Sequence, residues 1–191
     1  MPDKVINIIL SSMDTNDVSM SDTEVQKSRT ELDSHANMPV VGSECFIISD
    51  TGKTAEVHPY SPEYEVKIIP IVHAAVKYES KYTGIEYVLV IRNALYVPTM
   101  NNNLIPPFIM REAGIQVNDV PKCQMDDPTI KDHSLYFEET NFRIPLSLNG
   151  IFSYCSSSKP SKELMLDGEE VYILTPANYD PHSNVYRDNE L

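Results

Sequence analysis

Basic residues are scarce in this chain. Lys and Arg number 15 against 28 Asp and Glu, which gives a formal net charge of -13. A protein that binds a phosphate backbone needs clustered Lys and Arg to displace counterions. The scarcity of basic residues therefore argues against nucleic-acid binding by this segment.

Cysteine is also rare, and the three cysteines, Cys45, Cys123 and Cys155, are far apart with no Cys-x-x-Cys pair. An odd, dispersed set of this kind fits reduced thiols better than a disulfide framework or a zinc site. The histidines outside the motif discussed below have no metal-ligand spacing among themselves: His58, His73, His133 and His182. We therefore expect no metal site.

Long apolar runs are absent as well. The N-terminal stretch VINIIL is too short to span a membrane, and it lacks the basic flank and small-residue cleavage site of a secretory signal. The sequence thus predicts no membrane association and a cytoplasmic or nuclear location.

The chain divides by composition. Residues 1–29 contain few large apolar groups beyond VINIIL, which is a candidate for a short strand, and they predict a disordered leader. From residue 31 to 115, β-branched and aromatic runs alternate with turn signals such as SDTGK and PTMNNN. This spacing is typical of an all-β sandwich or barrel.

One helix is predicted after these strands, in NLIPPFIMREAGI. Two prolines suit the first turn of a helix, and Gly114 suits the position just past its end. Residues 117–175 carry further strand signals in HSLYFEE, FRIPLSL, IFSYC and VYILT, and are either a second small β unit or an extension of the first sheet. PSKELMLDGEE is predicted to be a loop, and residues 176–191 a flexible tail.

The stretch ELDSHANMPVVG places Asp33 before a hydroxyl residue and an apolar run. Such an aspartate is either a surface-turn residue or one half of a catalytic carboxylate pair, in which two acids share one proton. The other Asp-Ser/Thr pairs, at Asp14, Asp22 and Asp50, lack an apolar strand leading into them. A carboxylate pair built from this chain would therefore be intermolecular.

Two stretches carry a family resemblance. ELDSHA resembles the active-site loop of retropepsin-like aspartic proteases, and NALYVPTMNNNLIPPFIMREAGI is similar to the later part of the protease domain in copia-type retrotransposon polyproteins. The resemblance covers residues 30–116. It implies a closed β-barrel with one short helix, followed by a β-rich extension or linker unit at 117–175.

The resemblance also implies the roles of individual residues. Asp33 becomes the catalytic carboxylate, Ser34 the hydroxyl that links two active-site loops, and Ala36 the small residue after the turn. Leu104 and Ile105 become the apolar loop that supports the site. The implied protein is a homodimer that hydrolyses peptide bonds in an extended polypeptide, without a cofactor.

Two positions depart from the family pattern. His35 stands where the family has Gly, and it is either a solvent-facing loop residue or a group that tunes the carboxylate pair. The region expected to cover the substrate, VHPYSPEYEV at 57–66, contains prolines and no glycine. These departures keep a second hypothesis open, namely a catalytically silent remnant that acts as a β-rich dimerisation or protein-interaction module.

Overall fold

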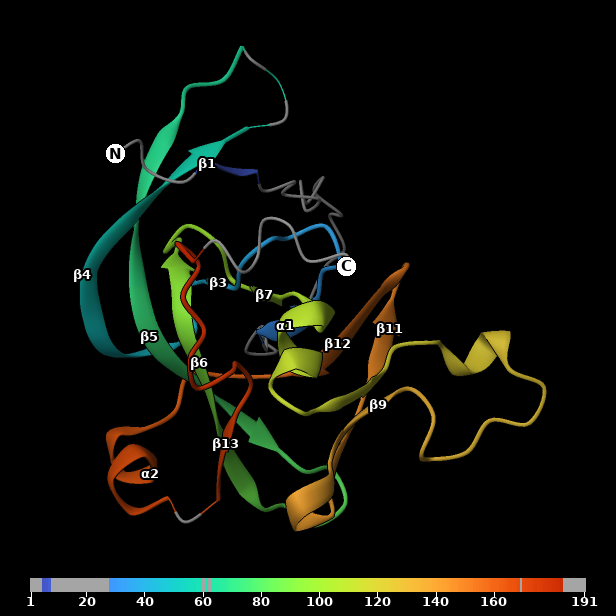
Figure 1. The fold of residues 1–191 in the computed structure, drawn as a ribbon. Helices are drawn as coiled ribbons and strands as arrows, with labels where there is room; N and C mark the ends of the chain where they lie inside the picture. The colour runs from blue at the N-terminus through green and yellow to red at the C-terminus, as the bar shows by residue number, and fades with distance from the viewer. Residues whose placement is uncertain (1–4, 8–27, 60, 62, 169, 184–191) are drawn as a thin grey trace, which may run out of the picture.

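The computed structural model describes residues 5–7, 28–59, 61, 63–168 and 170–183, and strands dominate this part of the chain (Figure 1). The mostly β class predicted from the sequence is confirmed. The strands are β1 (Val5–Asn7), β2 (Arg29–Leu32), β3 (Val40–Val41), β4 (Phe46–His58), β5 (Lys67–Glu79), β6 (Glu86–Tyr96), β7 (Asn103–Ile105), β8 (Gln116–Asn118), β9 (Ser134–Phe137), β10 (Phe142–Pro145), β11 (Ser147–Asn149), β12 (Phe152–Ser156) and β13 (Val171–Ile173).

Ten of these strands form one mixed sheet. Its order is β1-β4-β5-β6-β3-β7-β2-β12-β11, and β13 pairs with the first half of β6. A closed barrel would require hydrogen bonds between the two end strands, β1 and β11. No such pairing occurs among the described strands, so the closed barrel implied by the resemblance is not found and the sheet is open.

The longest strands, β4 and β5, form an antiparallel hairpin that projects from the body of the molecule (Figure 1). SDTGK does not form a turn between strands, contrary to the prediction, but lies inside β4. There the carboxylate of Asp50 accepts a hydrogen bond from the backbone N–H of Gly52 at 2.8 Å, and Gly52 adopts a φ of +71°. The register against β5 shifts at this point, so these residues make a bulge that bends the strand without ending it.

Two short α-helices occur in the described part of the chain. α1 (Pro107–Glu112) confirms the predicted helix, with Pro106 at its N-cap and Gly114 at a φ of +82° past its end. α2 (Lys162–Asp167) overturns the loop predicted for PSKELMLDGEE. The hydroxyl of Ser161 accepts a hydrogen bond from the N–H of Leu164 at 3.1 Å and caps this helix, a signal that the prediction overlooked.

Strands from the first and second halves of the sequence pair with each other. β12 pairs antiparallel with β2, β13 pairs parallel with β6, and the backbones of Lys77 and Ser158 are linked by two hydrogen bonds. A second sheet, β10-β9-β8, adds the buried Leu135 and Ile144 to the main core. These pairings support the alternative in which residues 117–175 extend the first sheet.

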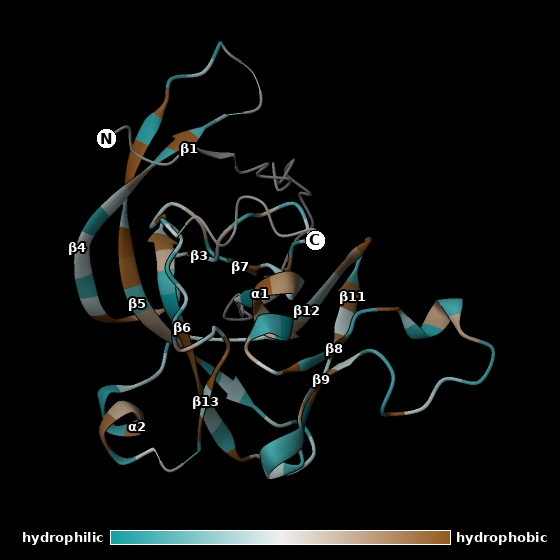
Figure 2. Cartoon of the chain, viewed as in Figure 1, coloured by the Kyte–Doolittle hydropathy of each residue, from teal (hydrophilic) through white to brown (hydrophobic). Residues whose placement is uncertain are grey.

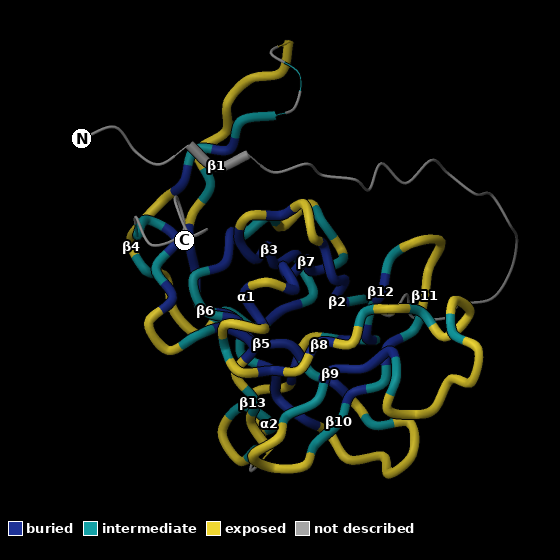
Figure 3. Tube along the Cα trace, turned by 45° about the vertical axis from the view of Figure 1, so that its right-hand side comes forward, coloured by how far each residue is buried: buried dark blue, intermediate teal, exposed yellow. Residues whose placement is uncertain are grey.

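Buried apolar residues form two clusters, one on each face of the central strands. The larger cluster includes Leu32, Val72, Ala74, Leu89, Ile105, Met110 and Cys155. The other, which we call the second core cluster, consists of Met38, Val40, Ala55, Val57, Ile71, Leu95, Leu104, Ile109 and Tyr179. β3 and β7 lie in the buried interior between the long strands and β2, as Figure 3 shows.

The ends of the chain are described in part. Residues 5–7, within VINIIL, form β1 and pair parallel with β4, while most of the predicted disordered leader, residues 1–4 and 8–27, lies outside the described residues. Residues 176–183 of the predicted tail are described, and Tyr179 in this segment is buried. Residues 184–191 lie outside the described part.

The three cysteines carry free thiols. Burial raises the pKa of Cys45 to about 11 and that of Cys155 to about 12, so both thiols are protonated at neutral pH. Neither helix in the described part is long and apolar enough to cross a membrane.

Candidate active site

Asp33 lies directly after the last residue of β2. Its backbone N–H donates to the carbonyl oxygen of Ile105 at 3.1 Å, so the chain is still held against β7 at this point. One carboxylate oxygen, Oδ1, accepts a hydrogen bond from the backbone N–H of His35 at 2.9 Å. This bond closes a tight turn, and it fixes the direction of the carboxylate.

The second carboxylate oxygen of Asp33, Oδ2, is buried and has no hydrogen-bond partner among the described residues. Only 3% of the side chain is exposed. Burying a carboxylate oxygen without a hydrogen bond is costly, so this oxygen needs a bound water molecule or another partner to offset the cost. The surface-turn interpretation of Asp33 does not account for this burial.

The supporting residues lie beside Asp33 because β7 is inserted between β2 and β3. Leu104 pairs with Glu31 on β2 and with Val40 on β3, and Ile105 pairs with Leu32. β2 and β3 are consecutive in the chain, so the loop that carries Asp33 must cross over β7. The structure therefore brings Leu104 and Ile105, both buried, against the candidate catalytic residue.

The loop that follows Asp33 contains both buried and exposed residues. Ala36 is buried, whereas Ser34 and His35 are exposed. The ring nitrogen Nδ1 of His35 lies 3.9 Å from Oδ1 of Asp33 and 3.5 Å from the hydroxyl of Ser34. Thus Ser34 faces solvent in the single chain, where a contact to a second active-site loop would require another copy.

His35 does not occupy the backbone conformation for which glycine is usually needed. The described non-glycine residues with positive φ are Asn93, His133 and Asn141. The replacement of Gly by His at position 35 therefore causes no backbone conflict, and the departure from the family pattern consists of the bulk and charge of the ring. That ring is 73% exposed beside the carboxylate.

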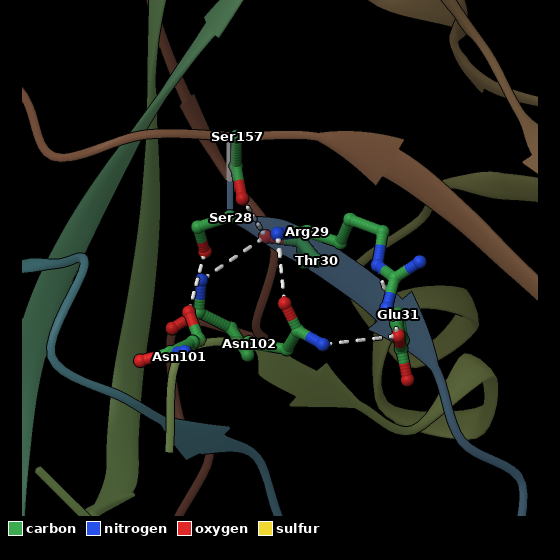
Figure 4. A network of polar contacts seen from close by, with 8 residues as sticks. Ser28, Arg29, Thr30, Glu31, Asn101, Asn102 and Ser157 are labelled. Atoms are coloured by element: carbon green, nitrogen blue, oxygen red, sulfur yellow. Dashed lines mark hydrogen bonds and ion pairs between the residues drawn. The ribbon is translucent and has the colours of Figure 1, made fainter. Parts of the chain in front are cut away.

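A polar network anchors the start of β2, as Figure 4 shows. The hydroxyl of Ser28 donates to the carbonyl of Asn101 at 2.7 Å, and the side chain of Asn102 accepts from the N–H of Arg29 at 3.2 Å. The amide of Asn102 also donates to the buried carboxylate of Glu31 at 3.3 Å. This network holds the residues before β7 in register with the strand that leads to Asp33.

Asn103 makes the deepest of these links, and the sequence analysis missed it. Its side-chain oxygen accepts from the N–H of Gly42 at 3.0 Å, and its amide donates to the hydroxyl of Thr30 at 3.4 Å. Thr30 in turn donates to the hydroxyl of Ser157 at 2.9 Å. The sequence signal was the run of three asparagines before LI, because the backbone carbonyl of Asn101 and the side chains of Asn102 and Asn103 fix the positions of the strands around the site.

The region expected to cover the substrate forms the tip of the β4–β5 hairpin. Hydrophobic and hydrophilic residues are both present along its strands (Figure 2), and residues 63–66 at the tip are exposed. Near the tip, Tyr64, Val66 and Ile68 are large apolar residues that face solvent. The hairpin therefore presents apolar side chains that a bound peptide or a second copy would cover.

A buried polar pair that lies outside the predicted site, His133 and Ser153, is structural. Nε2 of His133 lies 2.8 Å from the hydroxyl of Ser153, and both side chains are buried. Burial lowers the pKa of His133, and the nearby Lys122 acts in the same direction. Because solvent does not reach this pair, we interpret it as a satisfied core hydrogen bond. No group of three or more possible metal ligands occurs in the described part of the chain.

Comparison of the chain with protein-family models, curated proteins and solved structures found no match. The family resemblance therefore depends on the motifs in the sequence, and the geometry around Asp33 is independent of it.

Proposed function

We propose that this chain is one half of a retropepsin-like aspartic endopeptidase, which becomes complete when two copies bring their Asp33 carboxylates together. The observation that carries the proposal is the buried Oδ2 of Asp33, which has no hydrogen-bond partner among the described residues. This oxygen is enclosed in the single chain, so the loop that carries it would have to rearrange on dimerisation before a second carboxylate, together with a water molecule, could share a proton with Asp33 and satisfy it.

The chemistry of such a pair is general acid and base catalysis on water. One carboxylate takes a proton from the water molecule as the water oxygen attacks the scissile carbonyl carbon. The protonated partner gives its proton to the carbonyl oxygen, so a neutral tetrahedral diol forms. The protonated carboxyl then gives its proton to the amide nitrogen while the other carboxylate takes a proton from a diol hydroxyl, so the C–N bond breaks, an amine and a carboxylic acid form, and the pair again holds one proton. The residues before Asp33 and in β7 hold the carboxylate in position throughout.

The substrate in this proposal is an extended polypeptide segment of the retrotransposon polyprotein. It would lie between the Asp33 loop and the β4–β5 hairpin, where the exposed Tyr64, Val66 and Ile68 supply apolar contacts. A hairpin over an extended peptide offers backbone hydrogen bonds along the peptide, which suit binding in a strand-like conformation.

One observation favours the second hypothesis, a silent dimerisation module. The exposed ring of His35 lies 3.9 Å from Asp33, in the space that a substrate or the second carboxylate would have to share. If that ring blocks the approach, the fold keeps its capacity for dimerisation and loses catalysis.

Replacing Asp33 by Asn tests the proposal. The amide keeps the shape and the hydrogen bond from His35, yet it cannot exchange a proton, so cleavage of a peptide library at pH 4–6 should fall by about three orders of magnitude. Dimerisation, measured by analytical ultracentrifugation, should survive. Asp50→Asn is a matched control, because Asp50 accepts a hydrogen bond from the residue two positions later as Asp33 does. Equal activity of the two variants would exclude a catalytic role for Asp33, and an inert but dimeric parent would support the interaction module.

A further inference from the structure

One face of the central sheet carries a row of cross-strand partners that begins beside Asp33. In order across β2, β7, β3, β6, β5 and β4, the row is Glu31, Leu104, Val40, Leu95, Ile71 and Lys53. Directly paired residues project from the same face of a sheet. Asp33 follows Glu31 by two positions, and its backbone still bonds to β7, so its carboxylate belongs to this face as well.

The middle of this row is apolar, and it belongs to the same buried cluster as Tyr179. Leu104, Val40, Leu95 and Ile71 all belong to the second core cluster, together with Tyr179. The ring of Tyr179 comes from a segment more than 70 residues later in the chain than β7, and only 3% of the residue remains exposed. The buried cluster that includes the apolar middle of this row therefore also contains a side chain from the C-terminal segment.

The segment that carries Tyr179 follows β13 across this face toward β4. The N–H of Leu174 donates to the carbonyl of Val90 at 2.9 Å, and the N–H of Arg92 donates to the hydroxyl of Thr175 at 3.1 Å. The side-chain amide of Asn93 donates to the carbonyl of Tyr179. Nζ of Lys53 lies 3.9 Å from Oδ2 of Asp180. The ion pair lies at the β4 end of the row. The segment thus meets the apolar middle of the row with an aromatic ring and the basic end with a carboxylate.

We infer that residues 176–181, PANYDP, form an intramolecular pseudosubstrate that occupies the binding face of the site and must leave before a peptide binds. This inference rests on the proposed function of Asp33. It also names the peptide class that the face accepts. A large aromatic side chain fills the apolar subsite of Val40, Ile71, Leu95 and Leu104, and an acidic residue after it pairs with Lys53.

The way the segment is held suits a reversible contact. It forms no strand or helix between Pro176 and Pro181, and Ala177 and Asn178 are exposed. The buried Tyr179 and Pro181, a hydrogen bond from the side-chain amide of Asn93 to the carbonyl of Tyr179, and an ion pair whose side chains are 57% and 47% exposed hold it in place. Local release of such a segment needs less free energy than opening of the paired strands beneath it.

Peptide binding tests the inference without relying on cleavage. The probe is the capped, dye-labelled hexapeptide PANYDP, and the protein is the full chain carrying Asp33→Asn, with affinity measured by fluorescence anisotropy. Adding Tyr179→Ala should empty the subsite and tighten peptide binding by about tenfold or more, as expected when a buried aromatic side chain no longer competes. Adding Tyr82→Ala, which removes an exposed tyrosine, should leave the affinity within twofold.

A second variant covers the case in which Tyr179→Ala unfolds the chain. Asp180→Lys leaves the core intact and repels Lys53, so it should tighten peptide binding by about two- to fivefold. Asp127→Lys, at an exposed position away from the row, is its control. Peptide affinities that are unchanged in a folded Tyr179→Ala or in Asp180→Lys overturn the pseudosubstrate. Peptide binding is measured in the Asp33→Asn background, so it does not depend on whether Asp33 is catalytic. If the parent protein cleaves peptides but the added substitutions do not change peptide affinity, only the pseudosubstrate inference is refuted.

Discussion

The backbone N–H of Asp33 donates to the carbonyl oxygen of Ile105 at 3.1 Å, which continues the parallel pairing of β2 and β7 one residue beyond the end of β2. The candidate catalytic residue is therefore tied to a strand that lies far from it in the sequence. Any change that displaces residues 100–105 should also displace the carboxylate.

Gly42→Ala should destabilise the fold. A Cβ atom at this position would lie 2.3 Å from the carbonyl oxygen of Met100, so the loop before β7 would have to move, at a cost of about 2 kcal/mol or more in the free energy of unfolding. Urea denaturation measures this cost. Gly52→Ala is the comparison. A Cβ atom at Gly52 would meet open space, so only the φ of +71° is unfavourable for alanine, at a cost of about 1 kcal/mol in the free energy of unfolding. Equal costs at the two sites would show that the contact with Met100 relaxes freely.

Asn103→Leu should cost about 1–3 kcal/mol in the free energy of unfolding, because it leaves the buried N–H of Gly42 without its acceptor. Hydrogen exchange at the Gly42 amide should accelerate together with the loss of stability. Asn149→Leu, on the exposed strand β11, is the matched control and should change the stability by less than 0.5 kcal/mol, roughly the range of surface substitutions. Unchanged exchange at Gly42 would contradict the proposed link.

His35→Gly and His35→Ala should change peptide cleavage by the same factor, within about twofold. The φ of His35 is not positive, so the backbone does not need glycine here and removal of the ring is the common effect. Activity that rises equally in both variants would identify the ring as an obstruction. A gain confined to His35→Gly would instead show that the active loop needs a glycine conformation, and dimers that stay inert in both variants would favour the interaction module. The assay is kcat/KM on one library-derived peptide.

Stability should fall as the pH is lowered from 7.5 to 5.5. Burial lowers the pKa of His133, so the unfolded chain, whose histidines titrate near 6.5, binds more protons than the folded chain in this window and below it. His73 acts in the same direction, since burial lowers its pKa and its ring nitrogen accepts a hydrogen bond from the N–H of Asn93. Urea unfolding at both pH values measures the loss, which should shrink in His133→Asn. Asn tolerates the φ of +51° at this position and does not titrate. A loss of the same size in this variant would exclude His133 as its source.

Local signals predicted several elements well. The PP…G pattern located α1, because proline and glycine act on the backbone of their own segment. The strand that leads into Asp33 and the adjacent position of Leu104 and Ile105 also agree with the structure. By contrast, turn residues inside β4 misled the prediction, since tertiary pairing with β5 keeps the strand continuous through a bulge.

The features that the sequence could not show depend on distant contacts. Nothing local to IFSYC indicates that it pairs with β2, and nothing local to NYD indicates that Tyr179 is buried in the same cluster as Leu104. The sequence could not show that the sheet is open for the same reason, because closure depends on whether the two end strands pair with each other. The interpretation of Asp33 as an intermolecular site, which rested on the absence of a second motif, remains a prediction.

The insertion of β7 between β2 and β3 bears on the order in which the chain folds during synthesis. Thr30 on β2 is bonded to Asn103 and Ser157, which follow it by 73 and 127 residues. Contacts of such long range form late, because the intervening loop must close first. A nascent chain cannot complete the surroundings of Asp33 until residue 157 has left the ribosome. The timing of translation therefore delays assembly of the site until most of the chain has been made.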